Sequence, residues 1–227
     1  MPPSDSRSQL KRPKEPAAPK MPRSLAVARL PEHDLEDDRT YRSMAFTGID
    51  LSSRDVEIAD FEGCRLVDTG FAGTRLHRAG FVDVEFERCD LSTMAARMST
   101  VQRGRVSSSR LTGTAWTECA FRDVLFDGCR ADLARFRFST FTGTVFRDCS
   151  MPEADFQNAD LRGVRFERCD LTRAQFSQAQ MGGAHFADCT LVGIGGVTSL
   201  KGAIVRSQDA QGLLYVLAGA MGITIEE

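Results

Sequence analysis

Residues 146–171 read FRDCS MPEAD FQNAD LRGVR FERCD L, a stretch that decides the fold because its pattern repeats every five residues. The first residue of each group is apolar, and the residue two places before the next group is small or apolar. A period of five matches neither the 3.6 residues of a helical turn nor the two-residue alternation of a strand, so neither element would bury this pattern. Each group of five must therefore place one large and one small side chain inside and then turn.

The same phase runs without interruption from Phe46 to Leu191. All thirty positions in it are apolar, and they hold fourteen of the fifteen phenylalanines. The position two residues before each of these is mostly small, and it holds all seven cysteines, which are Cys64, Cys89, Cys119, Cys129, Cys149, Cys169 and Cys189. The three remaining phases are rich in Arg, Asp, Glu, Thr, Ser and Gly, which indicates an outer surface.

A longer repeat of twenty residues predicts the cross-section. The pattern Phe-x-x-Cys recurs at this spacing or a multiple of it, beginning at Phe86, Phe126, Phe146, Phe166 and Phe186. Four pentapeptides per turn would stack these residues in a square coil, each coil about 4.8 Å above the last. We therefore expect an all-β solenoid, a parallel β-helix of about seven coils with a C-terminal capping helix.

The segments Ala154-Asp155-Phe156-Gln157-Asn158 and Ala159-Asp160-Leu161-Arg162-Gly163 resemble the A(D/N)LXX consensus of the pentapeptide-repeat family. The resemblance covers residues 46–191 and implies a right-handed quadrilateral β-helix. Two places depart from the repeat. Core residues are smaller between Met94 and Ser109, and Leu133 and Phe138 are apolar outside the core phase. A bulge, a bend of the axis or an outward apolar patch would explain each departure.

Three regions are expected along the chain. Residues 1–40 are rich in Pro, Lys and Arg and predict a disordered tail, since residues 1–30 carry seven basic and two acidic side chains, a net of +5. The tail is interpreted as a solvated leader or as a basic arm for an anionic partner. Residues 41–198 are assigned to the β-helix and residues 199–227 to a C-terminal cap, because an open coil needs its end covered.

The cap is expected to contain a helix from Ser207 to about Met221, ended by Gly222. The helix is apolar over more of its surface than one capping face requires, which predicts a homodimer contact as well as a cap. In the resembling family, a C-terminal helix often joins two protomers. The candidate contact residues are Leu213, Leu214, Leu217 and Met221.

No catalytic, cofactor-binding or metal-binding residue is assigned, and no enzyme is expected. The cysteines have no zinc-site spacing and are interpreted as small buried apolar residues. The histidines, His33, His77 and His185, lie far apart in the repeat. The sequence also has no apolar run of membrane-spanning length and no secretory signal. An odd number of cysteines is typical of a reducing compartment, so a cytoplasmic location is expected.

Two classes of function fit such a rod. The first is a structural or scaffold protein with an unidentified protein partner. The second is the DNA-mimicking binding of DNA gyrase or another type II topoisomerase, in protection or inhibition, which the family resemblance implies for some members. Mimicry needs rows of carboxylates, but residues 46–191 hold 21 acidic side chains against 18 arginines. The scaffold is therefore favoured, and a chain with a net charge of -2 is not expected to bind nucleic acid along its rod.

Overall fold

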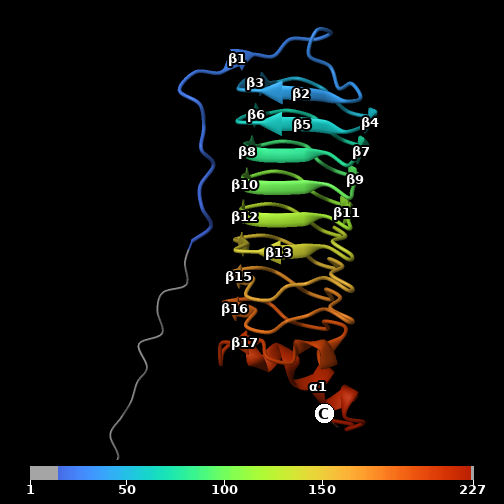
Figure 1. Ribbon diagram of the computed structural model, residues 1–227. Helices are drawn as coiled ribbons and strands as arrows, with labels where there is room; N and C mark the ends of the chain where they lie inside the picture. Colours follow the sequence, from blue (N-terminus) through green and yellow to red (C-terminus); the bar gives the residue numbers. More distant parts are fainter. Residues whose placement is uncertain (1–14, 226–227) are drawn as a thin grey trace, which may run out of the picture.

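In the computed structural model, which describes residues 15–225, each pentapeptide forms one side of a four-sided coil (Figure 1). The chain turns a corner every five residues at a positive φ angle, as at Asp148, Glu153 and Asn158. Each coil pairs with the next in parallel and in a register of twenty residues, so that Phe126 lies beside Phe146 and Phe146 beside Phe166. The predicted all-β solenoid is confirmed.

Two sheets line the rod. The larger has thirteen strands and includes the long strands β8, β10 and β12, which pass around one corner and so cover two sides. Its strands are β1 (Ala26–Val27), β2 (Arg39–Arg42), β3 (Met44–Thr47), β5 (Ala59–Glu62), β6 (Arg65–Val67), β8 (Gly80–Glu87), β10 (Thr100–Ser107), β12 (Ala120–Asp127), β13 (Thr140–Thr142), β14 (Val145–Arg147), β15 (Arg165–Glu167), β16 (His185–Ala187) and β17 (Ile204–Val205). The smaller contains β4 (Asp55–Glu57), β7 (Arg75–His77), β9 (Ala95–Arg97) and β11 (Ala115–Thr117).

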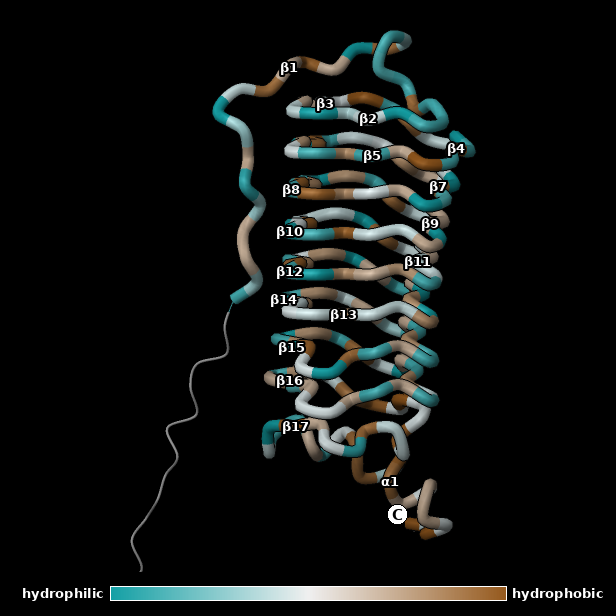
Figure 2. Tube along the Cα trace, in the orientation of Figure 1, coloured by the Kyte–Doolittle hydropathy of each residue, from teal (hydrophilic) through white to brown (hydrophobic). Residues whose placement is uncertain are grey.

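The core is a set of parallel aromatic columns. Phe126, Phe146 and Phe166 stack with ring centroids 4.7 Å and 5.2 Å apart and with nearly parallel planes. These distances match the rise between coils, since equivalent rings lie directly above one another. Phe136 and Phe156 form a second column, 5.2 Å apart, which meets the first edge to face. Figure 2 shows apolar residues recurring in each coil along the rod.

The rod has about nine turns, so the expectation of about seven was too low. The uninterrupted series of apolar positions begins at Phe46, but the first coil begins earlier in the chain. Tyr41, 1% exposed, stacks on Phe61, and β1 adds a strand beyond β3. At the other end, β17 pairs with β16 after the repeat has ended. These additional turns contain few in-phase apolar residues, because they pack against the repeat on one side only.

The two irregular places differ in their outcome. Between Met94 and Ser109 the register of twenty is kept through β9 and β10, so no bulge is present there. The larger side chains of Met94 and Trp116 fill the core beside the small residues, and Trp116 packs edge to face against Phe121. Leu133 and Phe138 point outward, with 53% and 55% of their surface exposed. An outward apolar patch is therefore observed at the second place, and at the first place Met98 is exposed as well, at 48%.

Residues 15–40 differ from the expected disordered tail, although residues 1–14 lie outside the described part of the chain. Residues 15–24 run beside the rod and reach β1 at its N-terminal end (Figure 1). Residues 29–38 then cover the first coil by turns rather than by a helix. Arg54 lies in a phase that is otherwise mostly small, and it donates to Asp34 of this cover at 3.0 Å. Tertiary contacts thus hold a segment whose composition alone predicts disorder.

The C-terminal end is closed by three short helical segments and β17. The 3-10 helices are η1 (Val197–Leu200) and η2 (Ala210–Leu213), and η2 leads directly into the α-helix α1 (Leu214–Ala220). The expected helix from Ser207 was too long, since residues before Leu214 form turns and a 3-10 helix instead. Gly222 follows the helix with a φ of 71°, as expected of a terminating glycine. The amide of Ile223 donates to the carbonyl of Ala218 at 2.8 Å and completes the helix end.

Candidate interaction surfaces

All seven cysteine side chains lie in the interior of the rod. All seven cysteines are free and buried, and most of their thiols donate to backbone carbonyls of the preceding coil. Cys89 donates to the Leu66 carbonyl at 3.3 Å, and Cys129 donates to the Val106 carbonyl at the same distance. Burial raises the pKa of Cys89 to about 11, so this thiol is almost fully protonated at neutral pH. The sulfur atoms therefore pack as small apolar groups.

No metal-binding cluster of three or more His, Cys, Asp or Glu side chains occurs within residues 15–225. The three histidines lie apart in the structure as in the sequence. His33 accepts from the Arg29 amide in the N-terminal cover, His77 lies 3.4 Å from Glu57, and His185 begins β16. In this same part of the chain, no helix has the length and apolar character needed to cross a bilayer.

Charges on the outer surface form ion pairs between neighbouring coils. The arginine and the carboxylate of such a pair are commonly twenty residues apart, because that spacing puts them at the same place in adjacent coils. Pairs of this kind join Arg54 to Asp34, Arg42 to Glu62, Arg65 to Glu85, Arg75 to Asp55, Arg88 to Asp68, Arg103 to Asp83, Arg147 to Glu167, Arg168 to Asp148 and Arg173 to Glu153. Carboxylates on the rod are thus repeatedly neutralised by a cation one coil away. The spacing of twenty in the sequence was the signal that would have predicted these pairs.

An outward apolar group, the corner patch, consists of Met98, Leu133 and Phe138. Leu133 and Phe138 lie at the two ends of the same pentapeptide side. Met98 lies two coils before Phe138 at the same corner, since residues 95, 115 and 135 are aligned by β-bridges. Each is about half exposed, with Met98 at 48%. All three have φ angles between 52° and 58°, the left-handed region in which bulky side chains are unfavourable.

Comparison with known families agrees with this repeat geometry. The family described as "Pentapeptide repeat region" matches residues 99–176 and 123–195, and "Pentapeptide repeats (8 copies)" matches residues 59–92. Together the matches cover more than half of the chain. This chain belongs to the pentapeptide-repeat family.

Solved structures of pentapeptide-repeat proteins are similar to it at low sequence identity. HetL, from the cyanobacterium Nostoc sp. strain PCC 7120 and involved in heterocyst differentiation regulation, is 18% identical. That match covers 74% of this chain and 85% of HetL, with a TM-score of 0.36. A trypsin-treated variant of QnrB1, a plasmid-mediated fluoroquinolone resistance protein, is 21% identical. It covers 82% of this chain and 99% of QnrB1, with a TM-score of 0.41. A search of curated proteins finds no match.

The C-terminal end of this pentapeptide-repeat protein carries a second apolar group. Of the four candidate dimer residues, Leu213 is only 6% exposed and belongs to the core cluster, so it serves the cap rather than an outer contact. The other three are exposed, at 56% for Leu214, 45% for Leu217 and 75% for Met221. Tyr215, which the sequence analysis did not select, is 65% exposed on the same short helix. Figure 2 shows this apolar segment extending beyond the last coil.

Proposed function

We propose that this pentapeptide-repeat protein is a non-enzymatic interaction protein whose rod binds a protein partner through the corner patch. The observation that carries the proposal is the exposure of two large apolar side chains, Leu133 and Phe138, on the wall of the rod. Both are bulky, exposed and held at a φ of 58°. One coil away, the chain has Gly113 and Glu153 at the corner of Leu133, and Glu118 and Asn158 at the corner of Phe138, so the neighbouring corners carry glycine, charged or polar residues at a similar φ.

Many non-glycine residues of the rod share this φ, so what distinguishes Leu133 and Phe138 is that they are apolar and exposed. Since they contribute nothing to the core, we assign their role to a contact outside the folded chain. Exposed apolar side chains that cluster on one face are typical of protein contact sites. Arg135 lies between Leu133 and Phe138 in the sequence and is exposed as well. Arginine beside an aromatic residue is a frequent combination at the centre of protein interfaces.

The test compares the rod with a variant that lacks the apolar corner. Leu133→Ser/Phe138→Ser should fold normally, because neither side chain packs in the core, but it should lose the proteins that co-purify with the wild type from its own cells. Val192→Ser is the matched control, since Val192 is also 55% exposed but lies near the C-terminal end. The proposal fails if the double variant retains the same partners as the wild type.

The alternative function is the binding of DNA gyrase by DNA mimicry, and the surface charge speaks against it. A mimic of duplex DNA needs a continuous row of negative charge, whereas carboxylates such as Asp68, Asp83 and Asp148 are each paired with an arginine. A supercoiling assay with purified gyrase tests this alternative. Protection or inhibition at stoichiometric protein would favour it over the corner patch.

Two further properties belong to the proposal. The exposed Leu214, Leu217 and Met221 support a homodimer through the C-terminal end, because an apolar group of this size is otherwise open to water. Seven unpaired thiols support a reducing, cytoplasmic location, where free cysteines persist.

A further inference from the structure

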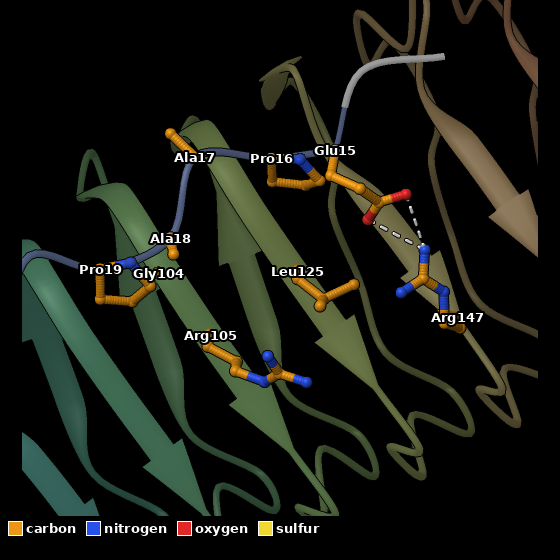
Figure 3. A pocket seen from close by; sticks show the side chains of 9 residues that line it. All are labelled: Glu15, Pro16, Ala17, Ala18, Pro19, Gly104, Arg105, Leu125 and Arg147. Carbon is orange, nitrogen blue, oxygen red and sulfur yellow. Dashed lines mark hydrogen bonds and ion pairs between the residues drawn. The ribbon is translucent and has the colours of Figure 1, made fainter. Parts of the chain in front are cut away.

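Residues 15–22, here called the strap, lie in extended form along the rod on the side that carries β10, β12 and β14 (Figure 3). The contacts advance along the rod from Gly63 to Asp123 as the strap runs from Pro22 to Ala17. The amide of Lys20 donates to Asp83 at 2.8 Å, and the amide of Ala17 lies 3.3 Å from a carboxylate oxygen of Asp123. Pro22 packs so closely on Gly63 that a Cβ atom there would lie 2.9 Å from the proline ring.

The length of the strap matches the rod. From Gly63 to Arg165 the strap crosses five coil spacings, roughly 24 Å at about 4.8 Å each. The seven residue steps from Glu15 to Pro22 span roughly 22 Å as a polyproline II helix. Prolines occur at every third position, Pro16, Pro19 and Pro22, which is the repeat of that helix. Proline also lacks an amide hydrogen, so these three positions leave no donor unsatisfied against the rod.

Glu15 ends the strap at two arginines. Arg147 donates to both carboxylate oxygens of Glu15 at 3.0 Å, and Arg165 donates to one of them at 2.8 Å. The side chain of Arg165 is only 8% exposed and that of Arg147 is 24% exposed. Glu167 contacts both guanidinium groups, at 2.9 Å and 3.3 Å, and so helps to orient them. Charge-assisted hydrogen bonds to partly buried arginines are among the stronger polar contacts.

The protonation of Glu15 agrees with this geometry. Burial alone would raise the pKa of Glu15, but the hydrogen bonds from Arg165 and Arg147 outweigh it and hold the pKa below its ordinary value. A groove of about 200 Å³ remains between the strap and the rod, lined by the strap and by Gly104, Arg105, Leu125 and Arg147 (Figure 3). The strap is thus held by an ionic contact at Glu15, by the amide hydrogen bonds of Ala17 and Lys20, and by the packing of Pro22 on Gly63.

We propose that Arg147 and Arg165 form a carboxylate-binding site for an extended, proline-containing segment that carries a carboxylate, and that Glu15 of this chain occupies it as a displaceable latch. Release of the strap uncovers the side of the rod that it crosses and makes the two arginines accessible to such a segment of a partner. The site lies on the side of the coil that contains Phe126 and its equivalents. The corner patch lies ten residues further along the repeat, which is two sides of the coil away, so the two sites are separate.

The first test measures the position of the strap in the full chain. Because the native cysteines are buried, spin labels can be placed at Ala18→Cys and Thr142→Cys, both exposed positions. A single narrow distribution of distances between the two labels is expected, and Glu15→Ala or Arg147→Ala should broaden that distribution. The same two variants should speed tryptic cleavage after Lys20 about tenfold. Arg168→Ala is the control, since Arg168 pairs with Asp148 and not with the strap. A broad distribution in the parent chain, or no effect of Glu15→Ala, would overturn the latch.

The second test supplies the ligand from solution. A fluorescent peptide of residues 15–24, EPAAPKMPRS, should bind the Glu15→Ala chain at least tenfold more tightly than the wild type, whose own latch competes. The Glu15→Ala/Arg147→Ala chain and a peptide with Glu15→Gln should each lose at least tenfold in affinity. Equal binding in all combinations, or none with the Glu15→Ala chain, would refute the carboxylate site.

Discussion

Arg103 donates two hydrogen bonds to Asp83, one coil earlier, at 2.6 Å and 2.7 Å. The same carboxylate accepts the amide of Lys20, so one side chain joins two coils and the strap. The relationship follows from the register of twenty, which places residue 103 directly beside residue 83. It also makes the rod sensitive to the protonation of its carboxylates.

Acid should destabilise the rod in a defined range. Hydrogen bonds from Arg103, Arg168 and Arg54 lower the pKa of Asp83, Asp148 and Asp34, respectively, below the ordinary value of 3.8. A carboxyl group with a lowered folded pKa stabilises the fold above its unfolded pKa and loses that contribution as the pH falls through the folded pKa.

The free energy of unfolding, measured in urea, should therefore stay level from about pH 8 to about pH 5 and fall below about pH 4. The Arg103→Gln chain should show a smaller fall than the wild type, whereas Arg135→Gln should not differ from it. An unchanged stability at about pH 3 would contradict the assigned ion pairs.

Removing one ring from the core should be costly. Phe146 is 2% exposed and is stacked between Phe126 and Phe166, so Phe146→Ala leaves a cavity in a column with little room to collapse. We expect a loss of about 3–5 kcal/mol in the free energy of unfolding. Arg135→Ala, on the outer surface, should cost less than about 0.5 kcal/mol. Denaturant titration measures both, and equal losses would mean that the phase assignment is wrong.

The native thiols should react slowly with a disulfide-exchange reagent. Burial raises the pKa of Cys89 to about 11 and that of Cys119 to about 12, which leaves little thiolate at about pH 8 and little access to it. All seven thiols should react once the chain is unfolded in guanidinium chloride. Two or more rapidly reacting thiols in the native protein would contradict the buried position of this phase.

The cap should depend on one glycine. Gly196 has a φ of 71°, and a Cβ atom there would lie 2.3 Å from the Ser177 amide nitrogen and 2.6 Å from the Phe176 carbonyl carbon. Gly163 has a φ of 72° but no atom within 4 Å of such a Cβ. Gly163→Ala should cost about 1–2 kcal/mol from the backbone conformation alone. Gly196→Ala should cost roughly 2 kcal/mol more, because the backbone must move. Equal melting temperatures would show that the cap yields without strain.

The oligomeric state tests the C-terminal surface. Leu217 is 45% exposed, so Leu217→Glu should give a folded monomer if the wild type is a dimer through this end. Leu213→Ala is the contrasting variant, since Leu213 is buried and its loss should lower stability by about 2–3 kcal/mol without changing the mass. Sedimentation at high micromolar concentration measures the mass directly. A wild type that stays monomeric would remove dimerisation from the proposal.

The sequence by itself determined the solenoid, its four sides and its buried cysteines. A strict period of five can be buried only by a chain that changes direction at every fifth residue. The interval of twenty between Phe-x-x-Cys segments indicates that four pentapeptides make one coil. For Leu133 and Phe138 the sequence left a bulge, a bend of the axis and an outward apolar patch as alternatives, and the structure showed that these side chains are exposed.

Only the tertiary structure decided the ends of the rod and the course of residues 15–24. Tyr41 lies one step of five before Phe46, but the residues before it do not continue the pattern, and β17 extends the coil after the pattern has ended. A terminal coil is stabilised by the neighbour on which it packs. Leu213 and Leu217 cannot be assigned to cap or surface from periodicity, since the helix is too short to establish a face. The strap depends on Glu15 meeting Arg147 and Arg165, partners more than 130 residues away. Local composition carries no information about contacts at that separation, because they exist only once the coils have stacked.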